Sequence, residues 1–200
     1  MAAATRGPLP GFIARVFAWL PATFFVWYLG APVLLWPAAL IVDVAARVGF
    51  PNLVSGVEQA GATLVFATML KPGGTLTGGA QITVDVNMLL YAFGLPLYAA
   101  LVLAARLPGL PRRLGVGYAI MIPVIAWGTL ADFLKNVAIT SGSTIASQTG
   151  FVAWQRESIA FAYQFGSLIL PTVVPAVVWV LTHRAFLERL KAGPSLSHSS

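Results

Sequence analysis

Polar and apolar residues alternate in the middle of the chain and then give way to a continuous apolar run. In residues 81–88 every second residue is apolar, and this period of two is typical of a strand with one side on a core and the other in water. The alternation stops at Met88, and an uncharged run continues to Ala105. A run of about 18 apolar residues is long enough to span a bilayer as a helix. The sequence therefore predicts a water-facing strand that leads directly into a membrane helix.

Three more long apolar runs complete the pattern. Together the runs predict four transmembrane helices, over residues 12–42, 88–105, 114–137 and 159–181. The first run is far longer than the 7–15 apolar residues of a signal peptide, so we interpret it as a retained anchor. Pro21, Pro32 and Pro37 should bend or divide it, and neighbouring helices must then satisfy the carbonyl groups that lose their partners.

Residues 50–87 form the one sizeable water-facing part that the pattern predicts. We expect strands over residues 62–70 and 81–87 around a Gly-rich loop, and turn residues in 51–61. This predicts a small β-hairpin between the first two membrane helices. Because an isolated hairpin is only marginally stable, its apolar side should be covered, and we expect the protein's own helices to cover it.

These elements predict a mainly α membrane protein with a single membrane domain over residues 12–185. Residues 1–11 are small and polar, and we expect them to be disordered. Residues 186–200 end the chain as a basic and then Ser-rich tail, which we expect to be cytoplasmic.

Composition agrees with a membrane protein and excludes several other classes. Hydrophobic residues make up 58% of the 200 residues and charged residues 9%, against about 25% charged in typical soluble domains. The net charge of +6 could indicate nucleic-acid binding, but the basic residues lie at the ends of apolar runs, so we predict no nucleic-acid partner. Because the chain has no cysteine, disulfides, thiolate metal sites and a cysteine nucleophile are excluded.

The distribution of Lys and Arg predicts the orientation in the membrane. Eight of the 12 basic residues fall before the first run or near its start, between the second and third runs, or after the fourth. The positive-inside rule then places both termini in the cytoplasm and the hairpin on the opposite side.

Charged and amide side chains cluster at the predicted outer ends of the helices and strand. We expect a candidate outer polar cluster made of Asp85, Asn87, Asp132, Lys135, Arg156 and Glu157. Asp132 and Lys135 are three apart on a helix and should form an interfacial ion pair. Asn87 should cap the helix that begins after the strand.

The sequence predicts no catalytic residue, metal site or cofactor. The Gly-rich stretch 73–79 lacks the spacing of a phosphate-binding loop. His183 and His198 have no sequence neighbours that suit metal ligation or triad catalysis.

Three segments resemble a known family in the same order, namely residues 25–40, 85–105 and 122–135. They are similar to the exosortase H-associated membrane proteins of Gram-negative bacteria. The most specific part of the resemblance consists of Asn87, Tyr91, Gly94, Leu95, Pro96, Leu97, Ala100 and Leu101. The resemblance implies residence in the bacterial inner membrane beside an exosortase sorting system, and it implies no catalytic residue.

The resemblance favours an accessory role over catalysis. Exosortases resemble membrane transpeptidases that use Cys, Arg and His, and this chain has no cysteine. We therefore expect a non-enzymatic protein that assists an exosortase-type sorting system, with the lipid bilayer and an exosortase or its substrates as partners. Two alternatives stay open: a component of a small-molecule transporter or channel, and a membrane enzyme that uses the outer polar cluster.

Overall fold

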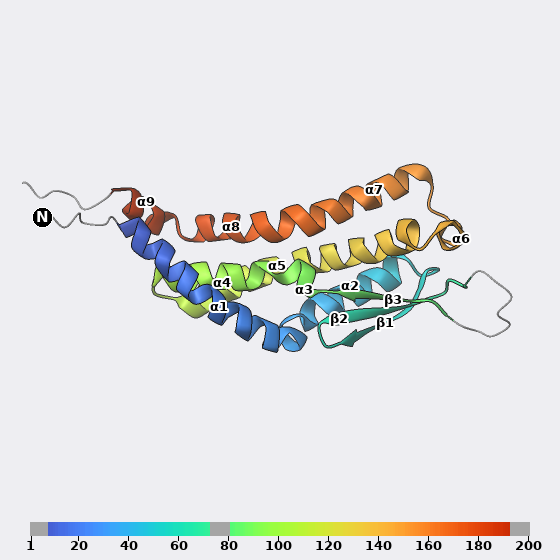
Figure 1. The fold of residues 1–200 in the computed structure, drawn as a ribbon, viewed down its shortest axis with the longest axis horizontal. Helices are drawn as coiled ribbons and strands as arrows, with labels where there is room; N and C mark the ends of the chain where they lie inside the picture. The colour runs from blue at the N-terminus through green and yellow to red at the C-terminus, as the bar shows by residue number, and fades with distance from the viewer. Residues whose placement is uncertain (1–7, 73–80, 193–200) are drawn as a thin grey trace, which may run out of the picture.

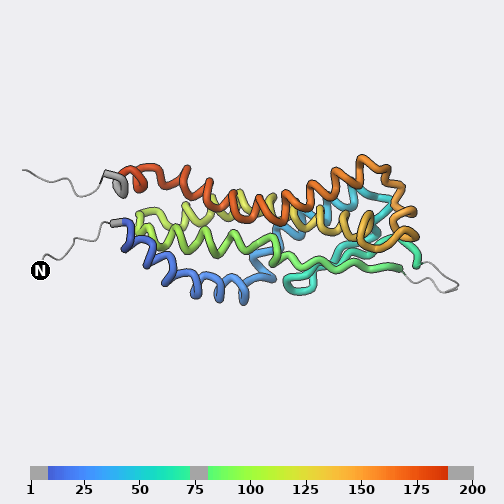
Figure 2. The backbone as a smooth tube through the Cα atoms, turned by 45° about the horizontal axis from the view of Figure 1, so that its top comes forward, coloured from blue at the N-terminus to red at the C-terminus, as the bar shows by residue number. Residues whose placement is uncertain are grey.

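The computed structural model describes residues 8–72 and 81–192, which form a long bundle of helices with a small sheet at one end (Figure 1). The first helix begins beside the last helix at the opposite end, as the tube of Figure 2 also shows. We call these two ends the sheet end and the terminal end. The longer elements, in chain order, are α1 Pro8–Leu34, α2 Trp36–Gly49, β1 Val54–Ala60, β2 Thr63–Thr68, β3 Thr83–Asn87, α4 Gly94–Ala105, α5 Leu110–Lys135, α7 Ala153–Gln164, α8 Leu170–Thr182 and α9 Arg184–Ala192. The short ones are α3 Leu89–Ala92, the π-helix η1 Asn136–Thr140, α6 Ser143–Ala146, the 3-10 helix η2 Ser147–Thr149 and the π-helix η3 Phe165–Ile169.

The first apolar run is divided, as its prolines predict. Helix α1 ends at Leu34, and α2 begins at Trp36 with a proline in its first turn. Two carbonyl oxygens beside the break are satisfied from outside the run. Gln59 Nε2 of β1 donates to the Pro32 oxygen at 2.8 Å, and the Tyr118 hydroxyl of α5 donates to the Leu34 oxygen at 2.8 Å. Other segments thus replace the helical partners at the break.

Three helical stretches in the described part of the chain are long and apolar enough to cross a membrane, over Leu9–Leu34, Leu110–Thr140 and Ala153–Thr182. The fourth predicted span corresponds to Leu89–Ala105, which is apolar but shorter. The structure therefore supports a membrane protein and three of the predicted spans, and it does not establish the fourth. At 1.5 Å per residue the 31 residues of Leu110–Thr140 are about 46 Å long, against about 30 Å of hydrocarbon.

The described residues form an antiparallel sheet of three strands in the order β1-β2-β3. The expected hairpin had only two strands, so one strand was missed. Strands β2 and β3 pair as predicted, with Phe66 opposite Val84 and Leu64 opposite Val86. The missed strand β1 lies where turn residues were expected. Its sequence, VSGVEQA, lacks the regular alternation that would predict a strand. Pairing with β2 stabilises the strand. Residues 73–80 of the predicted Gly-rich loop lie outside the described residues.

The apolar side of the sheet packs on the protein's own helices, as predicted. Phe66 of β2 is fully buried and stacks on Phe133 of α5, with ring centroids 4.1 Å apart and an interplanar angle of 12°. Val86 is 1% exposed, whereas Thr83 and Asp85 on the other side of β3 are exposed. The buried cluster continues into α2 through residues such as Val42, so α2, α5 and the sheet share one core.

Glycines allow the helices nearer the middle of the bundle to approach closely. A Cβ on Gly128 of α5 would lie 2.4 Å from Cδ1 of Tyr91 and 3.1 Å from the Gly166 oxygen of η3. A Cβ on Gly94 would lie 2.7 Å from the Pro171 oxygen. Close backbone contact at small residues is the usual way in which membrane helices associate.

The terminal end is more ordered than the sequence predicts. Helix α1 begins at Pro8, so residues 8–11 of the expected disordered segment are helical, while residues 1–7 lie outside the described residues. The expected tail likewise begins inside helix α9. Phe12 of α1 packs against both Trp179 of α8 and Phe186 of α9, with ring centroids 5.4 Å apart in each pair. This aromatic contact joins the first and last helices.

The packing of the sheet predicts the effect of a charge on its apolar side. Val84→Asp should lower the free energy of unfolding by about 1–3 kcal/mol, because a half-buried carboxylate would face the core. The matched control is Thr83→Asp, one residue away on the exposed side of the same strand. Thermal unfolding of the purified protein in one detergent compares the three chains. Equal midpoints for Val84→Asp and the wild type would contradict packing on the protein's own helices.

Candidate functional site

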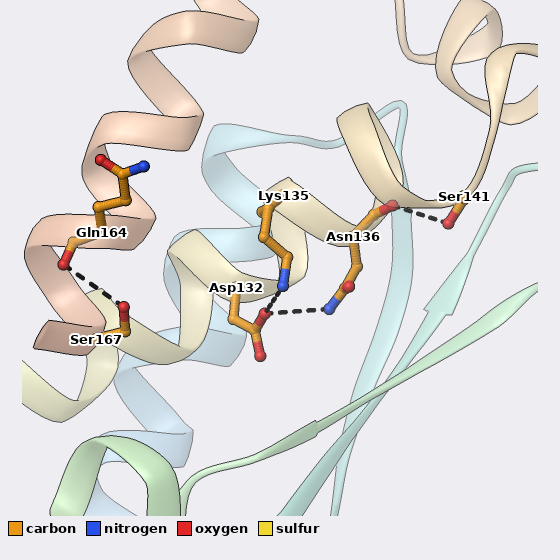
Figure 3. A network of polar contacts seen from close by, with 6 residues as sticks. All are labelled: Asp132, Lys135, Asn136, Ser141, Gln164 and Ser167. Carbon is orange, nitrogen blue, oxygen red and sulfur yellow. Dashed lines mark hydrogen bonds and ion pairs between the residues drawn. The ribbon is translucent and has the colours of Figure 1, made fainter.

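The most enclosed charged pair lies at the sheet end of α5. Lys135 Nζ is 2.8 Å from Asp132 Oδ1, and Asn136 Nδ2 donates to the same oxygen at 3.2 Å (Figure 3). The Asp132 residue is only 8% exposed. The expected ion pair therefore exists, and Asn136 joins it at the i+4 position, which the sequence analysis missed.

An aromatic ring and a change of helix type surround this pair. Lys135 Nζ lies 4.1 Å from the centroid of the Tyr163 ring, so α7 supplies a cation–π contact. The π-helix η1 follows Lys135 directly, and there the Ser141 hydroxyl donates to the Asn136 oxygen at 2.8 Å. Across from it, the Ser167 hydroxyl of η3 is 3.5 Å from the Gln164 oxygen (Figure 3). Single π-helical turns are frequent at functional sites, and here two of them flank one charged pair.

The two candidate residues of β3 face away from this pair. Asp85 and Asn87 are exposed, on the side of the strand opposite the buried Val86. Asn87 Oδ1 accepts a hydrogen bond from the Leu89 amide at 3.0 Å, but α3 begins at Leu89 with Met88 at its N-cap, so Asn87 lies one residue before the expected cap position. Asn87 thus has a structural role that explains its position.

The remaining candidates, Arg156 and Glu157, lie on the exposed surface of α7. In the part of the chain that the structure describes, neither takes part in an ion pair. The hydrogen bonds and ion pairs of the described residues do not connect them with Asp132, nor do they connect Asp85 with it. Of the six candidates, the structure joins Asp132 and Lys135, and the other four are separate surface positions.

The chemistry of the joined pair is that of an enclosed, neutralised ion pair. Asp132 accepts from one ammonium and one amide, so its charge is compensated at a site with little water. Among residues 8–72 and 81–192, no group of three or more His, Asp or Glu side chains is placed to hold a metal ion. Through the contact of Lys135 with Tyr163, the pair also connects α5 with α7.

A second enclosed polar residue, His183, lies at the terminal end, where the sequence predicted no partners for it. Its ring is 1% exposed and stacks on Trp179, with centroids 5.3 Å apart. His183 Nδ1 is 3.0 Å from the Trp179 oxygen and 2.9 Å from the Thr182 hydroxyl oxygen. Burial lowers the pKa of His183, the hydrogen bond to Trp179 opposes this, and nearby Arg113 lowers it further. The uncharged imidazole therefore acts as part of the aromatic packing.

Comparison with known proteins gives one match. The chain matches the model of the family described as exosortase H-associated membrane protein over residues 6–186. No curated protein and no solved structure matches it.

The enclosure of the Asp132–Lys135 pair predicts that breaking it and reversing it have different effects. Asp132→Asn should lower the free energy of unfolding by about 1–3 kcal/mol, because it leaves the partly buried ammonium without its counter-charge. Combining Asp132→Lys with Lys135→Asp should restore part of the loss, since the i,i+3 pair is kept and the Asn136 amide can accept as well as donate, whereas the cation–π contact with Tyr163 is lost. Thermal unfolding in detergent measures both.

Glu157→Gln, which changes an exposed charge at the same end, serves as the control and should leave the midpoint unchanged. A reversed pair that is as stable as the wild type but abolishes protein sorting in cells would contradict a structural role.

Proposed function

The chain belongs to the family of exosortase H-associated membrane proteins, and on this ground we propose that it is a non-enzymatic accessory protein of an exosortase-type sorting system. The match covers residues 6–186, which include all of the membrane helices and the sheet, and this single observation carries the proposal. The absence of cysteine from the sequence supports it, because the chain cannot supply the thiol nucleophile of a cysteine transpeptidase. The role left to the chain is to hold or present other components.

The proposal includes an orientation in the bacterial inner membrane, with both termini in the cytoplasm. Its support is the number of arginines on the described elements at the terminal end, where α1 begins beside α9 (Figure 1), namely Arg15, Arg106, Arg112, Arg113 and Arg184. Leu89–Ala105 then serves as a short fourth crossing. The sheet end faces the compartment in which exported substrates are sorted.

Helix α7 offers the exposed surface that best suits a protein partner. Counting about 20 residues of bilayer back from Thr182 reaches Tyr163, so α7 continues beyond the hydrocarbon. Trp154 and Phe161, seven residues apart on one face, are 66% and 68% exposed there. Exposed aromatic residues beside charged ones, here Arg156 and Glu157, are typical of protein interfaces. We place the contact with the exosortase or its substrate on this face.

Co-purification tests both the function and the surface. A tagged chain extracted from its native membranes should retain the exosortase, and deletion of its gene should reduce sorting of exported substrates. Combining Trp154→Ser with Phe161→Ser should lower the retained exosortase by at least about tenfold, since two aromatic anchors commonly contribute more than 1 kcal/mol each.

The control is Trp36→Ser, which removes an equally exposed tryptophan from α2. Absence of the exosortase from the purified material, together with normal sorting in the deletion strain, would contradict the proposed function. If the double variant of Trp154 and Phe161 retains the exosortase as well as Trp36→Ser does, the contact does not lie on this face of α7.

A further inference from the structure

A groove runs along the side of the bundle between α1, α4 and α5, nearer the terminal end. Its cavity volume is about 500 Å³. It is lined by Trp19, Ala22, Thr23, Val26, Trp27, Leu34, Leu95, Pro96, Tyr98, Ala99, Leu103, Leu114, Gly115 and Tyr118. We call it the lateral groove. All of these residues belong to apolar helices, so the groove opens where the bilayer surrounds the protein.

Small residues and internal hydrogen bonds leave the lateral groove both open and apolar. A Cβ on Gly115 would meet nothing within 4 Å, so the space beside it is free. The hydroxyl of Thr23 already donates within its own helix, to the Trp19 and Leu20 oxygens. The Tyr118 hydroxyl donates a hydrogen bond to the Leu34 oxygen. What faces the cavity is therefore almost entirely hydrocarbon.

The dimensions of the groove suit an extended chain rather than a helix. On α1 its lining extends from Trp19 to Leu34, about 22 Å at 1.5 Å per residue. A volume of about 500 Å³ over that length corresponds to a cross-section of about 22 Å². A helix about 10 Å across requires about 80 Å². A partner's helix would not fit, whereas a single hydrocarbon chain would.

Two of the helix faces that line the groove carry an arginine one turn closer to the terminal end. On α1, Arg15 precedes Trp19 by four residues, and on α5, Arg112 precedes Gly115 by three, so each lies one turn below the groove on the same face. Arg15 Nε donates to the Ala104 oxygen at 3.0 Å, which fixes its guanidinium at the end of α4. Its remaining N–H groups are not used by that bond.

A third arginine and the scarcity of acids add to the positive charge at this end. Arg106 is exposed and follows the groove residue Leu103 by three positions. The chain has six acidic residues, and all six lie within the described ranges. Five belong to α2, the sheet, the sheet end of α5, or α7, which leaves Glu188 of α9 at the terminal end.

We propose that the lateral groove and these arginines form a binding site for one anionic phospholipid of the leaflet at the terminal end. One acyl chain lies in the groove against Trp19 and Trp27. The phosphate group lies one turn below, at Arg15 and Arg112, with Arg106 beside them. Guanidinium groups bind phosphate oxygens through paired N–H donors, and a basic group at this depth favours anionic over zwitterionic headgroups.

The two tryptophans of the groove provide a direct test, because bromine on a lipid chain quenches indole fluorescence on contact. The full-length protein is reconstituted in phosphatidylcholine vesicles that contain a varied fraction of chain-brominated phosphatidylglycerol, or of chain-brominated phosphatidylcholine. Subtracting the signal of a variant with Trp19→Phe and Trp27→Phe isolates the groove. Brominated phosphatidylglycerol should reach half of its quenching at a mole fraction at least about fivefold lower than brominated phosphatidylcholine.

Two pairs of variants separate the headgroup from the chain. Arg15→Gln with Arg112→Gln should remove the preference for phosphatidylglycerol, whereas Arg184→Gln, an exposed arginine of α9 at the same end, should keep it. Gly115→Leu should fill the groove and abolish quenching by both lipids, whereas Gly49→Leu, at an equally open position on α2, should not.

Equal half-quenching fractions for the two brominated lipids would overturn the proposal. So would a preference that survives loss of Arg15 and Arg112. If neither lipid quenches the groove tryptophans of the wild-type chain, protein rather than lipid fills the groove, and the proposal is equally overturned.

Discussion

The stacking of Phe66 on Phe133 joins the sheet to the central helix, and the arrangement of the sheet end depends on it. Helix α5 with η1 is about 46 Å long, which exceeds the hydrocarbon thickness by about half. The part that leaves the bilayer exposes apolar residues that lipid no longer covers. The sheet and α2 cover them, so the excess length of one helix accounts for the core at the sheet end.

The same helix organises the rest of the molecule through contacts of different kinds. Its Gly128 admits η3 and Tyr91, its Tyr118 satisfies a carbonyl at the break between α1 and α2, and its Lys135 lies over the Tyr163 ring. These contacts provide close packing, a hydrogen-bond donor and an aromatic face for a cation, respectively. Helix α5 thus contacts α7 and the sheet as well as the break between α1 and α2.

Local patterns predicted the parts of this fold that local physics determines. The alternation in residues 81–88 identified which side of β3 is buried, and Pro32 and Pro37 indicated the break in the first run. The strand β1 was missed because Gly56, Glu58 and Gln59 obscure its alternation, and its stability comes from pairing with β2. The helical start at Pro8 was missed for a similar reason, since the packing of Phe12 against Trp179 is not visible in sequence spacing.

The sequence likewise predicted only those parts of the candidate sites that depend on local spacing. The spacing of Asp132 and Lys135 identified their pairing, but their enclosure by Tyr163 depends on how α7 packs. Residues Asp85, Arg156 and Glu157 shared only a predicted side of the membrane, and that did not bring them to Asp132. The lateral groove could not be predicted from the sequence, because a cavity depends on the angle at which the helices pack. For the same reason, the sequence used Arg15 only to predict the orientation in the membrane, and its contact with the end of α4 was not predicted.

A double-mutant cycle measures directly whether the aromatic stack of Phe66 and Phe133 holds the sheet to α5. Phe66→Leu, Phe133→Leu and the combined variant are unfolded at equilibrium in the same mixed micelles as the wild type. We expect a coupling free energy of about 0.5–1.5 kcal/mol between the two positions, because stacked rings contribute beyond their buried area. Strictly additive losses, with no coupling, would show that the sheet does not depend on this contact.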